Sequence, residues 1–198
     1  MNIIAHRRNT IQELVATPRQ YGVEVDIRSS LDRLIIHHDA FVDGDDFEEW
    51  LAAYRHGTLI LNVKEEGLEE RLIALMKSAG IEDYFFLDQS FPFIVKWAAA
   101  ANRRSAVRVS EYESVETALS LAGKVDWVWV DCFTQLALSA ADARRLADAN
   151  FKLCLVSPEL QGRNPDTEIP SMIATLQERG IDAHSVCTKR PDLWIEPR

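Results

Sequence analysis

Short apolar runs typical of strands alternate with helix-like segments along almost the whole of this chain. Strands that alternate with helices are joined by crossovers and form a parallel sheet covered by helices. Eight strands favour a closed sheet, so we predict a compact α/β fold, the (β/α)₈ TIM barrel. The expected strands are 2–6, 22–28, 58–64, 84–89, 105–110, 127–133, 152–156 and 183–188, with a short extended return at 34–39.

The expected helices fill the segments between these strands. Asp46 is the predicted N-cap of helix 47–55, Ser139 caps 140–150, and Gly80 ends 68–78. Pro170 is expected in the first turn of a helix that ends at Gly180. The remaining helices are 10–20, 92–101 and 115–121. The alternative is an open, doubly wound sheet, which usually has a glycine-rich turn after its first strand; residues 6–9 contain no glycine.

Length and charge limit the classes of protein that need to be considered. With 198 residues, 47% of them hydrophobic, the chain can bury one core, and without an interdomain linker we predict a single domain over 1–198. A net charge of −9 argues against a nucleic-acid partner but allows a local phosphate pocket. No apolar run reaches the roughly 18 residues of a membrane span. We expect a cytoplasmic protein.

Three cysteines, Cys132, Cys154 and Cys187, lie far apart and form no CxxC pair. This spacing predicts reduced, buried thiols and neither a disulfide framework nor a zinc site. A catalytic thiol at Cys132, which follows Asp131 at a strand end, is the alternative.

Two carboxylates, Glu24 and Asp26, interrupt the apolar strand 22–28. Alternate strand side chains share a face, so both acids lie on one face and the valines and isoleucine between them fill the other. Two carboxylates in one buried place repel each other unless a cation or a proton intervenes.

Polar residues also mark the ends of the other expected strands, where a barrel builds its active site. His6 ends the first strand, and Asn62 and Lys64 share a face at the end of the third. Acids, an imidazole and cations together suggest a divalent metal, a phosphate and acid–base chemistry, although a polar strand end can also simply meet solvent. The other strand ends contribute Asp88, Gln89, Arg108, Ser110, Asp131 and Ser157.

These residues resemble, in order along the chain, the motifs of the glycerophosphodiester phosphodiesterase family, a metal-dependent branch of the phospholipase-C-like barrels. The resemblance covers the chain and is strongest in its first third. The matching motifs are His6-Arg7, Asn9-Thr10, Glu24-Val25-Asp26, His38-Asp39, Asn62-Val63-Lys64 and, more loosely, Thr188-Lys189-Arg190-Pro191.

The resemblance implies a phosphodiester hydrolase acting on a glycerophosphodiester-like small molecule with one Mg²⁺ or Ca²⁺. Oxygen ligands suit either cation, and imidazoles can exchange protons near neutral pH. The implied roles are metal ligation by Glu24, Asp26 and Asn62, general acid–base catalysis by His6 and His38, and phosphate binding by Arg7 and Lys64.

Three departures from the family pattern keep alternatives open. Asn62 replaces a carboxylate ligand, Arg8 replaces a glycine, and the family's usual insertion before the third strand is missing. Asp88 or Asp131 could supply the missing charge, and His37-His38 could instead be a surface pair. The alternative function is a catalytically reduced barrel that binds a phosphorylated ligand or a partner protein; formation of a cyclic phosphate is a third reading. The oligomeric state is not predicted.

Overall fold

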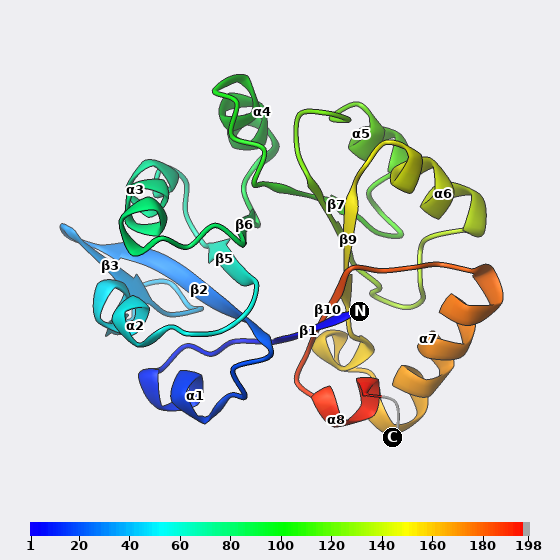
Figure 1. Cartoon of the computed structure of the whole chain (residues 1–198), viewed down its shortest axis with the longest axis horizontal. Coiled ribbons are helices and arrows are strands. Elements are labelled where there is room, and N and C mark those ends of the chain that lie inside the picture. Colours follow the sequence, from blue (N-terminus) through cyan, green and yellow to red (C-terminus); the bar gives the residue numbers. More distant parts are fainter. Residues whose placement is uncertain (196–198) are drawn as a thin grey trace. The chain divides into compact units, whose positions relative to one another are not determined.

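The computed structural model describes residues 1–195, which form two compact units (Figure 1). The N-terminal unit is Ala5–Lys96. The C-terminal unit contains Met1–Ile4 and the residues from Trp97 onward. All seven residues predicted to form the site lie in the N-terminal unit.

Strand β2 (Gly22–Ser30) is the centre of the N-terminal unit. It pairs in parallel with β5 (Leu59–Val63), which pairs in parallel with β6 (Tyr84–Leu87). On its other side β2 pairs with the antiparallel β3 (Arg33–Ile36), followed by the short β4 (Asp45–Asp46). The helices are α1 (Ile11–Ala16), α2 (Phe47–Ala53), α3 (Glu69–Ala79) and α4 (Phe91–Ala99), the last of which runs across the unit boundary.

The two faces of β2 have opposite chemistry, as the sequence predicts. Val23, Val25 and Ile27 are fully buried in the hydrophobic core. That core also takes Leu14 from α1, Phe47 and Trp50 from α2, and Leu72 and Met76 from α3. Glu24 and Asp26 are also buried, but they alternate with the core valines and so lie on the opposite face.

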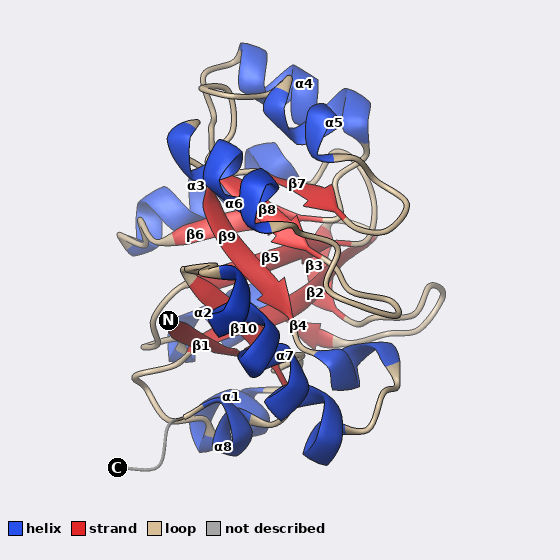
Figure 2. Cartoon of the chain, turned by 90° about the vertical axis from the view of Figure 1, so that its right-hand side faces the viewer, coloured by secondary structure: helices blue, strands red, loops and turns tan. Residues whose placement is uncertain are grey.

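The C-terminal unit has a parallel sheet in the order β1-β10-β9-β8-β7. Figure 2 shows β8 and β9 side by side, with helices around them. The strands are β1 (Asn2–Ala5), β7 (Ala106–Val109), β8 (Trp127–Val130), β9 (Lys152–Val156) and β10 (Ser185–Thr188). The helices are α5 (Val115–Leu119), α6 (Ala140–Asp148), the 3₁₀ helix η1 (Pro158–Gln161), α7 (Pro165–Arg179) and α8 (Pro191–Trp194).

Every predicted strand is present, and the α/β class is confirmed. The complete barrel is not confirmed, because the strand ladders among residues 1–195 do not join into a closed ring. The predicted caps are confirmed: Asp46 accepts from the backbone of Glu48 and Glu49, Ser139 accepts from Asp142, and Gly80 adopts φ 66° at the end of α3. A single domain over 1–198 stays a prediction.

The expected position of Pro170 is wrong. Helix α7 begins at Pro165, whose N-terminal neighbour Asn164 caps it by accepting from the backbone of Asp166, so Pro170 lies inside the helix. Pro165 satisfies the same first-turn preference that suggested Pro170, because its missing N–H is not needed there. The helix therefore begins at the Asn164-Pro165 pair and not at Pro170.

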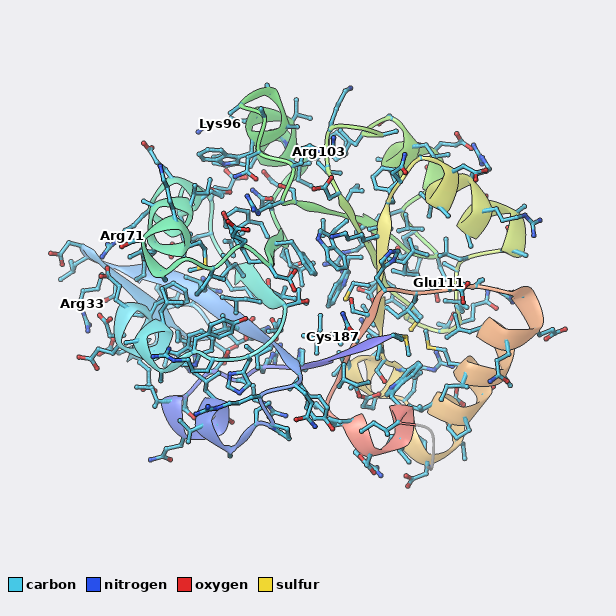
Figure 3. All side chains as sticks on the ribbon, in the orientation of Figure 1. Arg33, Arg71, Lys96, Arg103, Glu111 and Cys187 are labelled. Atoms are coloured by element: carbon cyan, nitrogen blue, oxygen red, sulfur yellow. The ribbon has the colours of Figure 1, made fainter. Side chains whose placement is uncertain are left out.

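The three cysteines are free and buried, as predicted. Cys187 lies on β10, and Figure 3 labels it among the side chains of the C-terminal unit. Burial, and then the charge of Asp131, raise the pKa of Cys132 to about 12. A thiol with such a pKa is protonated at neutral pH, which argues against a nucleophilic Cys132.

Glu111, also labelled in Figure 3, organises the loop that follows β8. Its carboxylate accepts from the backbone N–H groups of Phe133, Thr134 and Gln135. Burial acts to raise the pKa of Glu111, but the hydrogen bonds from Thr134 and Gln135 together outweigh it and lower the pKa to about 2. The carboxylate is therefore ionised at neutral pH and holds the loop in place.

No helix within residues 1–195 combines the length and the apolar character needed to cross a bilayer.

Candidate functional site

The parallel register of β2 and β5 brings the polar residues of the two strands together. Asp26 lies directly opposite Asn62, and Glu24 lies two pairs earlier, opposite Ile60, on the same face. Lys64 follows the end of β5, and its backbone N–H donates to the carbonyl of Ile27. The prediction that side chains at the ends of the second and third strands converge is thus met by the strand pairing.

Glu24 is buried and is held by three neighbours. Its Oε2 accepts from the backbone N–H of Arg7 at 2.7 Å, and its Oε1 accepts from Asn62 Nδ2 at 2.8 Å. His6 Nε2 lies 3.8 Å from Oε2. Burial, and next the Asp26 carboxylate, raise the pKa of Glu24 to about 7, against the opposing effects of Asn62, Arg7 and Lys64. Glu24 can therefore exchange a proton near neutral pH.

Asp26 has no exposed surface and is surrounded by cations and one amide. Lys64 Nζ lies 3.1 Å from Oδ1, and Arg7 Nε lies 3.4 Å from Oδ2. Asn9 bonds to it twice: Nδ2 donates to Oδ2 at 2.8 Å, and Oδ1 accepts from the Asp26 backbone N–H at 3.1 Å. These partners offset part of the cost of burying the charge, and Oδ1 has an ion pair with Lys64 but accepts no hydrogen bond from the described residues.

The loop after β1 is fixed where it passes the two acids. Arg7 has the left-handed backbone angle φ 50°, and its backbone N–H donates to Glu24. The backbone N–H of Arg8 donates to the carbonyl of Glu24 at 2.9 Å, and the carbonyl of Arg8 accepts from Trp50 Nε1 at 2.8 Å. Thr10 and Glu13 then form a capping box that starts α1. Left-handed backbone at a non-glycine residue costs energy and is frequent at functional sites.

The backbone of His38 is linked to that of Lys64 by the Arg28 side chain, which donates to both carbonyls. The His38 carbonyl accepts from Arg28 Nη2 at 2.9 Å, and Arg28 Nη1 donates to the carbonyl of Lys64 at 3.4 Å. The His38 ring is partly exposed and pairs with Asp39, with 2.7 Å between Nδ1 and Oδ1. This hydrogen bond is the largest cause of the lowered pKa of Asp39, to which the charge of Arg7 also contributes. Within residues 1–195, the His38 ring makes no hydrogen bond or ion pair with Glu24, Asp26 or Asn62.

The donor set for a cation consists of oxygen atoms. Asn62 Oδ1 is buried and has no hydrogen-bond partner among the described residues, which is the state expected of an oxygen that meets an ion or water. With Glu24 and Asp26 it makes an all-oxygen set that suits Mg²⁺ or Ca²⁺ but carries only two carboxylates. Within residues 1–195, no three His, Cys, Asp or Glu side chains are arranged to hold a metal.

Several residues at this site were not predicted from the sequence. Asn9 was noted only as part of a motif, and the hydrogen bond from Trp50 to the carbonyl of Arg8 was not predicted. Asp88, considered only as a substitute ligand, pairs with Lys64 Nζ at 3.2 Å and has φ 62°. The bonds of Asn9 join residues 17 positions apart, so no local sequence signal indicated them.

Glu24→Gln should change how stability depends on pH. Between the ordinary pKa of 4.5 and the folded value of about 7, the folded chain holds a proton that the unfolded chain lacks. The free energy of unfolding contributed by Glu24 therefore falls as pH rises through this window. Urea denaturation at pH 5 and pH 8, in chelator, should show the wild type losing stability relative to Glu24→Gln at the higher pH. The exposed Glu70→Gln serves as the control, and a difference independent of pH would contradict the expectation.

The chain has the fold of solved glycerophosphodiester phosphodiesterases, as its motifs predict. No protein-family model matches the chain, and no curated protein matches it by sequence.

Three solved structures illustrate the likeness. A glycerophosphodiester phosphodiesterase from Agrobacterium tumefaciens is 16% identical, with a TM-score of 0.65 over 98% of each chain. Another structure from that bacterium, of a provisionally assigned glycerophosphoryl diester phosphodiesterase, is 16% identical, with a TM-score of 0.67 over 97% of this chain and 94% of the other. A glycerophosphoryl diester phosphodiesterase from Parabacteroides distasonis is 14% identical, with a TM-score of 0.64 over 97% of this chain and 84% of the other. At these identities the likeness concerns the fold.

Proposed function

We propose that this protein is a metal-assisted phosphodiesterase that hydrolyses a small, glycerophosphodiester-like molecule. The observation that carries the proposal is the buried Glu24–Asp26 pair, with His6, Arg7 and Lys64 placed around it. Burying two adjacent carboxylates costs stability, and a site that uses their charge accounts for that cost. The shared fold supports the same reaction class.

Arg7 and Lys64 bind the phosphate in this proposal. Negative charge grows on the phosphoryl oxygens as the diester is attacked, and fixed cations stabilise it. The Arg7 side chain is 40% exposed, so its guanidinium can turn to a ligand while its backbone stays bonded to Glu24. Lys64 is held between Asp26 and Asp88 and acts as a positioned charge.

Glu24, Asp26 and Asn62 would hold the divalent cation. When bound, a Mg²⁺ or Ca²⁺ ion supplies Lewis-acid stabilisation of the phosphoryl oxygens. The unpartnered Oδ1 of Asn62 supports its role as the third oxygen ligand. An amide in place of a carboxylate lowers the charge of the site, so we expect weaker metal binding than three carboxylates would give.

His6 and His38 exchange the protons of the reaction. One imidazole accepts the proton of the attacking water while the other donates a proton to the departing alkoxide. The Glu24 carboxylate near His6 Nε2 and the Asp39 carboxylate near His38 Nδ1 would each fix the orientation of a ring and stabilise its charged form. For the surroundings of the protein we propose the cytoplasm, whose reducing conditions suit three free thiols.

The proposal is tested by measuring turnover of glycerol-linked, sugar-linked and lipid-linked phosphodiesters with added Mg²⁺ or Ca²⁺ and with chelator. We expect turnover of a glycerol-linked diester that is lost on chelation and restored by the metal. Phosphorus NMR of the products distinguishes hydrolysis from formation of a cyclic phosphate. Turnover that survives chelation would remove the metal from the mechanism.

Asn62→Asp provides the matched variant for this experiment. The change is nearly isosteric, but it removes the Nδ2 donor to Glu24 and adds a carboxylate beside two others. Without metal the variant should be less stable than the wild type, and added metal should raise its melting temperature more than that of the wild type. Equal metal-induced shifts in both proteins would argue that Asn62 is not a ligand.

A second candidate function is binding of a phosphorylated ligand without turnover. It is favoured by one observation: Arg7 and Lys64 already compensate the charge of Asp26. Because these side chains already balance the charge of Asp26, less negative charge remains to bind a metal ion. Binding of inorganic phosphate or a phosphomonoester by calorimetry, with no turnover across the panel of diesters, would support this function.

A further inference from the structure

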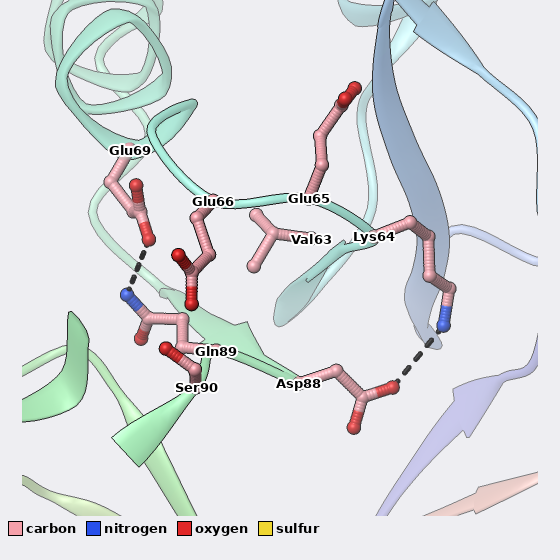
Figure 4. A pocket seen from close by; sticks show the side chains of 8 residues that line it. All are labelled: Val63, Lys64, Glu65, Glu66, Glu69, Asp88, Gln89 and Ser90. Carbon is pink, nitrogen blue, oxygen red and sulfur yellow. Dashed lines mark hydrogen bonds and ion pairs between the residues drawn. The ribbon is translucent and has the colours of Figure 1, made fainter. Parts of the chain in front are cut away.

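A pocket of about 290 Å³ opens beside the candidate site, between the loops that follow β5 and β6 (Figure 4). Lys64 belongs to both, because its Nζ contacts Asp26 in the site and Asp88 in the pocket. The pocket is therefore adjacent to the place proposed for the phosphate. Its lining residues are Val63, Lys64, Glu65, Glu66, Glu69, Asp88, Gln89 and Ser90.

The lining is strongly acidic. Glu65, Glu66, Glu69 and Asp88 contribute four carboxylates, and Lys64 is the single cationic side chain among the lining residues. The charge of Lys64 is shared between Asp26 and Asp88, at 3.1 and 3.2 Å. The pocket thus keeps an excess of negative charge, which attracts a cationic group.

Two buried oxygen atoms in this pocket have no partner among the described residues. Gln89 is only 9% exposed; its Nε2 donates to Glu69 Oε1 at 2.9 Å, which leaves its Oε1 unpaired. Ser90 Oγ is buried and also unpaired. In Figure 4 both side chains lie on the side of the pocket where Glu66 points toward them. Unpaired buried acceptors are costly, and an N–H donor would satisfy them.

A metal ion fits this pocket poorly. Both oxygens of the buried Glu69 are already used, Oε1 by Gln89 and Oε2 by the backbone N–H of Gly67 at 3.1 Å. Glu65 accepts from the backbone N–H of Ser29 and Asp88 pairs with Lys64, so Glu66 is the one lining carboxylate without a partner among the described residues. One carboxylate is too few to hold a bare cation, and the volume suits a small organic group. A quaternary ammonium also fits poorly, because it has no N–H to donate and the lining offers no aromatic ring.

We propose that this pocket binds the primary ammonium group of the substrate's alcohol, such as the ethanolamine of an ethanolamine-linked phosphodiester. The inference rests on the proposed function, since Lys64 then holds the phosphate while the neighbouring pocket takes the amine. The ammonium donates to Gln89 Oε1 and Ser90 Oγ, and the Glu66 carboxylate provides charge. The pocket therefore favours phosphodiesters in which one alcohol carries a positively charged group with N–H donors.

The experiment compares kcat/KM for three glycerophosphodiesters whose second alcohol is ethanolamine, choline or glycerol. The wild type should prefer the ethanolamine diester by about tenfold, as expected for charge-assisted hydrogen bonds. Glu66→Gln and Ser90→Ala should each lower this preference by roughly threefold or more and leave turnover of the glycerol-linked diester unchanged. Glu70→Gln, an exposed glutamate in the first turn of α3 that does not line the pocket, is the control and should change neither.

Equal kcat/KM for the ethanolamine and glycerol diesters, or an equal preference for choline, would overturn the inference while leaving the proposed function intact. Calorimetry with phosphoethanolamine and glycerol phosphate tests the case in which the pocket binds an amine but the protein hydrolyses no diester. If no diester is turned over, tighter binding of phosphoethanolamine that Glu66→Gln weakens would support the pocket and reject the hydrolase. If Glu66→Gln alters metal affinity and not the choice of alcohol, the pocket is not an ammonium site.

Discussion

Replacing His6 with alanine should lower phosphodiester turnover by about 10²- to 10⁴-fold, the range typical of losing a positioned general acid or base. His6 Nε2 lies 3.8 Å from the Glu24 carboxylate, at the end of β1. The side chain is not part of the hydrophobic core, so the fold should persist. The measurement is kcat at saturating substrate, together with a thermal melt of each protein.

His38→Ala should give a loss of similar size if the two imidazoles share the proton transfers. The control is His56→Gln, because the His56 ring bonds to the carbonyl of Thr17 on another part of the unit. A His6→Ala protein that keeps more than about a tenth of wild-type turnover would show that His6 is not the acid or base. Full activity in His38→Ala alone would assign the second proton transfer to another group.

Lys64→Met should reduce the free energy of unfolding by about 3 kcal/mol, the lower part of the range for breaking a buried ion pair. Asp26 is completely buried and Lys64 is 13% exposed, so the methionine leaves the Asp26 charge with only Arg7 and Asn9 as side-chain partners. Turnover should also fall, since a phosphate-binding cation is lost. Urea denaturation measures the first effect and steady-state kinetics the second.

Lys77→Met is the matched control for this change, because Lys77 is an exposed lysine in the last turn of α3. Its effect on stability should stay within about 0.5 kcal/mol. The double variant Lys64→Met with Asp26→Asn should recover part of the lost stability, because the unpaired charge is then removed. No recovery would mean that Lys64 stabilises the fold through packing and not through Asp26.

Much of the candidate site could be predicted because it depends on strand periodicity. Glu24 and Asp26 share a face by alternation alone, and parallel pairing of β2 with β5 then places Asn62 opposite Asp26. The same periodicity indicated which residues of β2 enter the core. These features need no knowledge of the loops.

The features that escaped prediction depend on loop geometry and tertiary contact. The double hydrogen bond between Asn9 and Asp26 requires the left-handed turn at Arg7, which no residue type in that segment demands. The hydrogen bond between Glu69, the first residue of α3, and Gln89 in the loop after β6 joins positions 20 residues apart. Closure of the sheet stays a prediction, because the number of strands does not determine whether the strands at its two ends pair with each other.

The indole of Trp50 gives the site an optical reporter. Its Nε1–H donates to the carbonyl of Arg8, so the ring is anchored to the segment that carries His6 and Arg7. It is the single tryptophan between Ala5 and Lys96, since the other four lie at positions 97, 127, 129 and 194. The difference in emission between the wild type and Trp50→Phe therefore isolates a signal from beside the segment that carries His6 and Arg7. Ligand-induced shifts of that segment can be followed through this signal in solution.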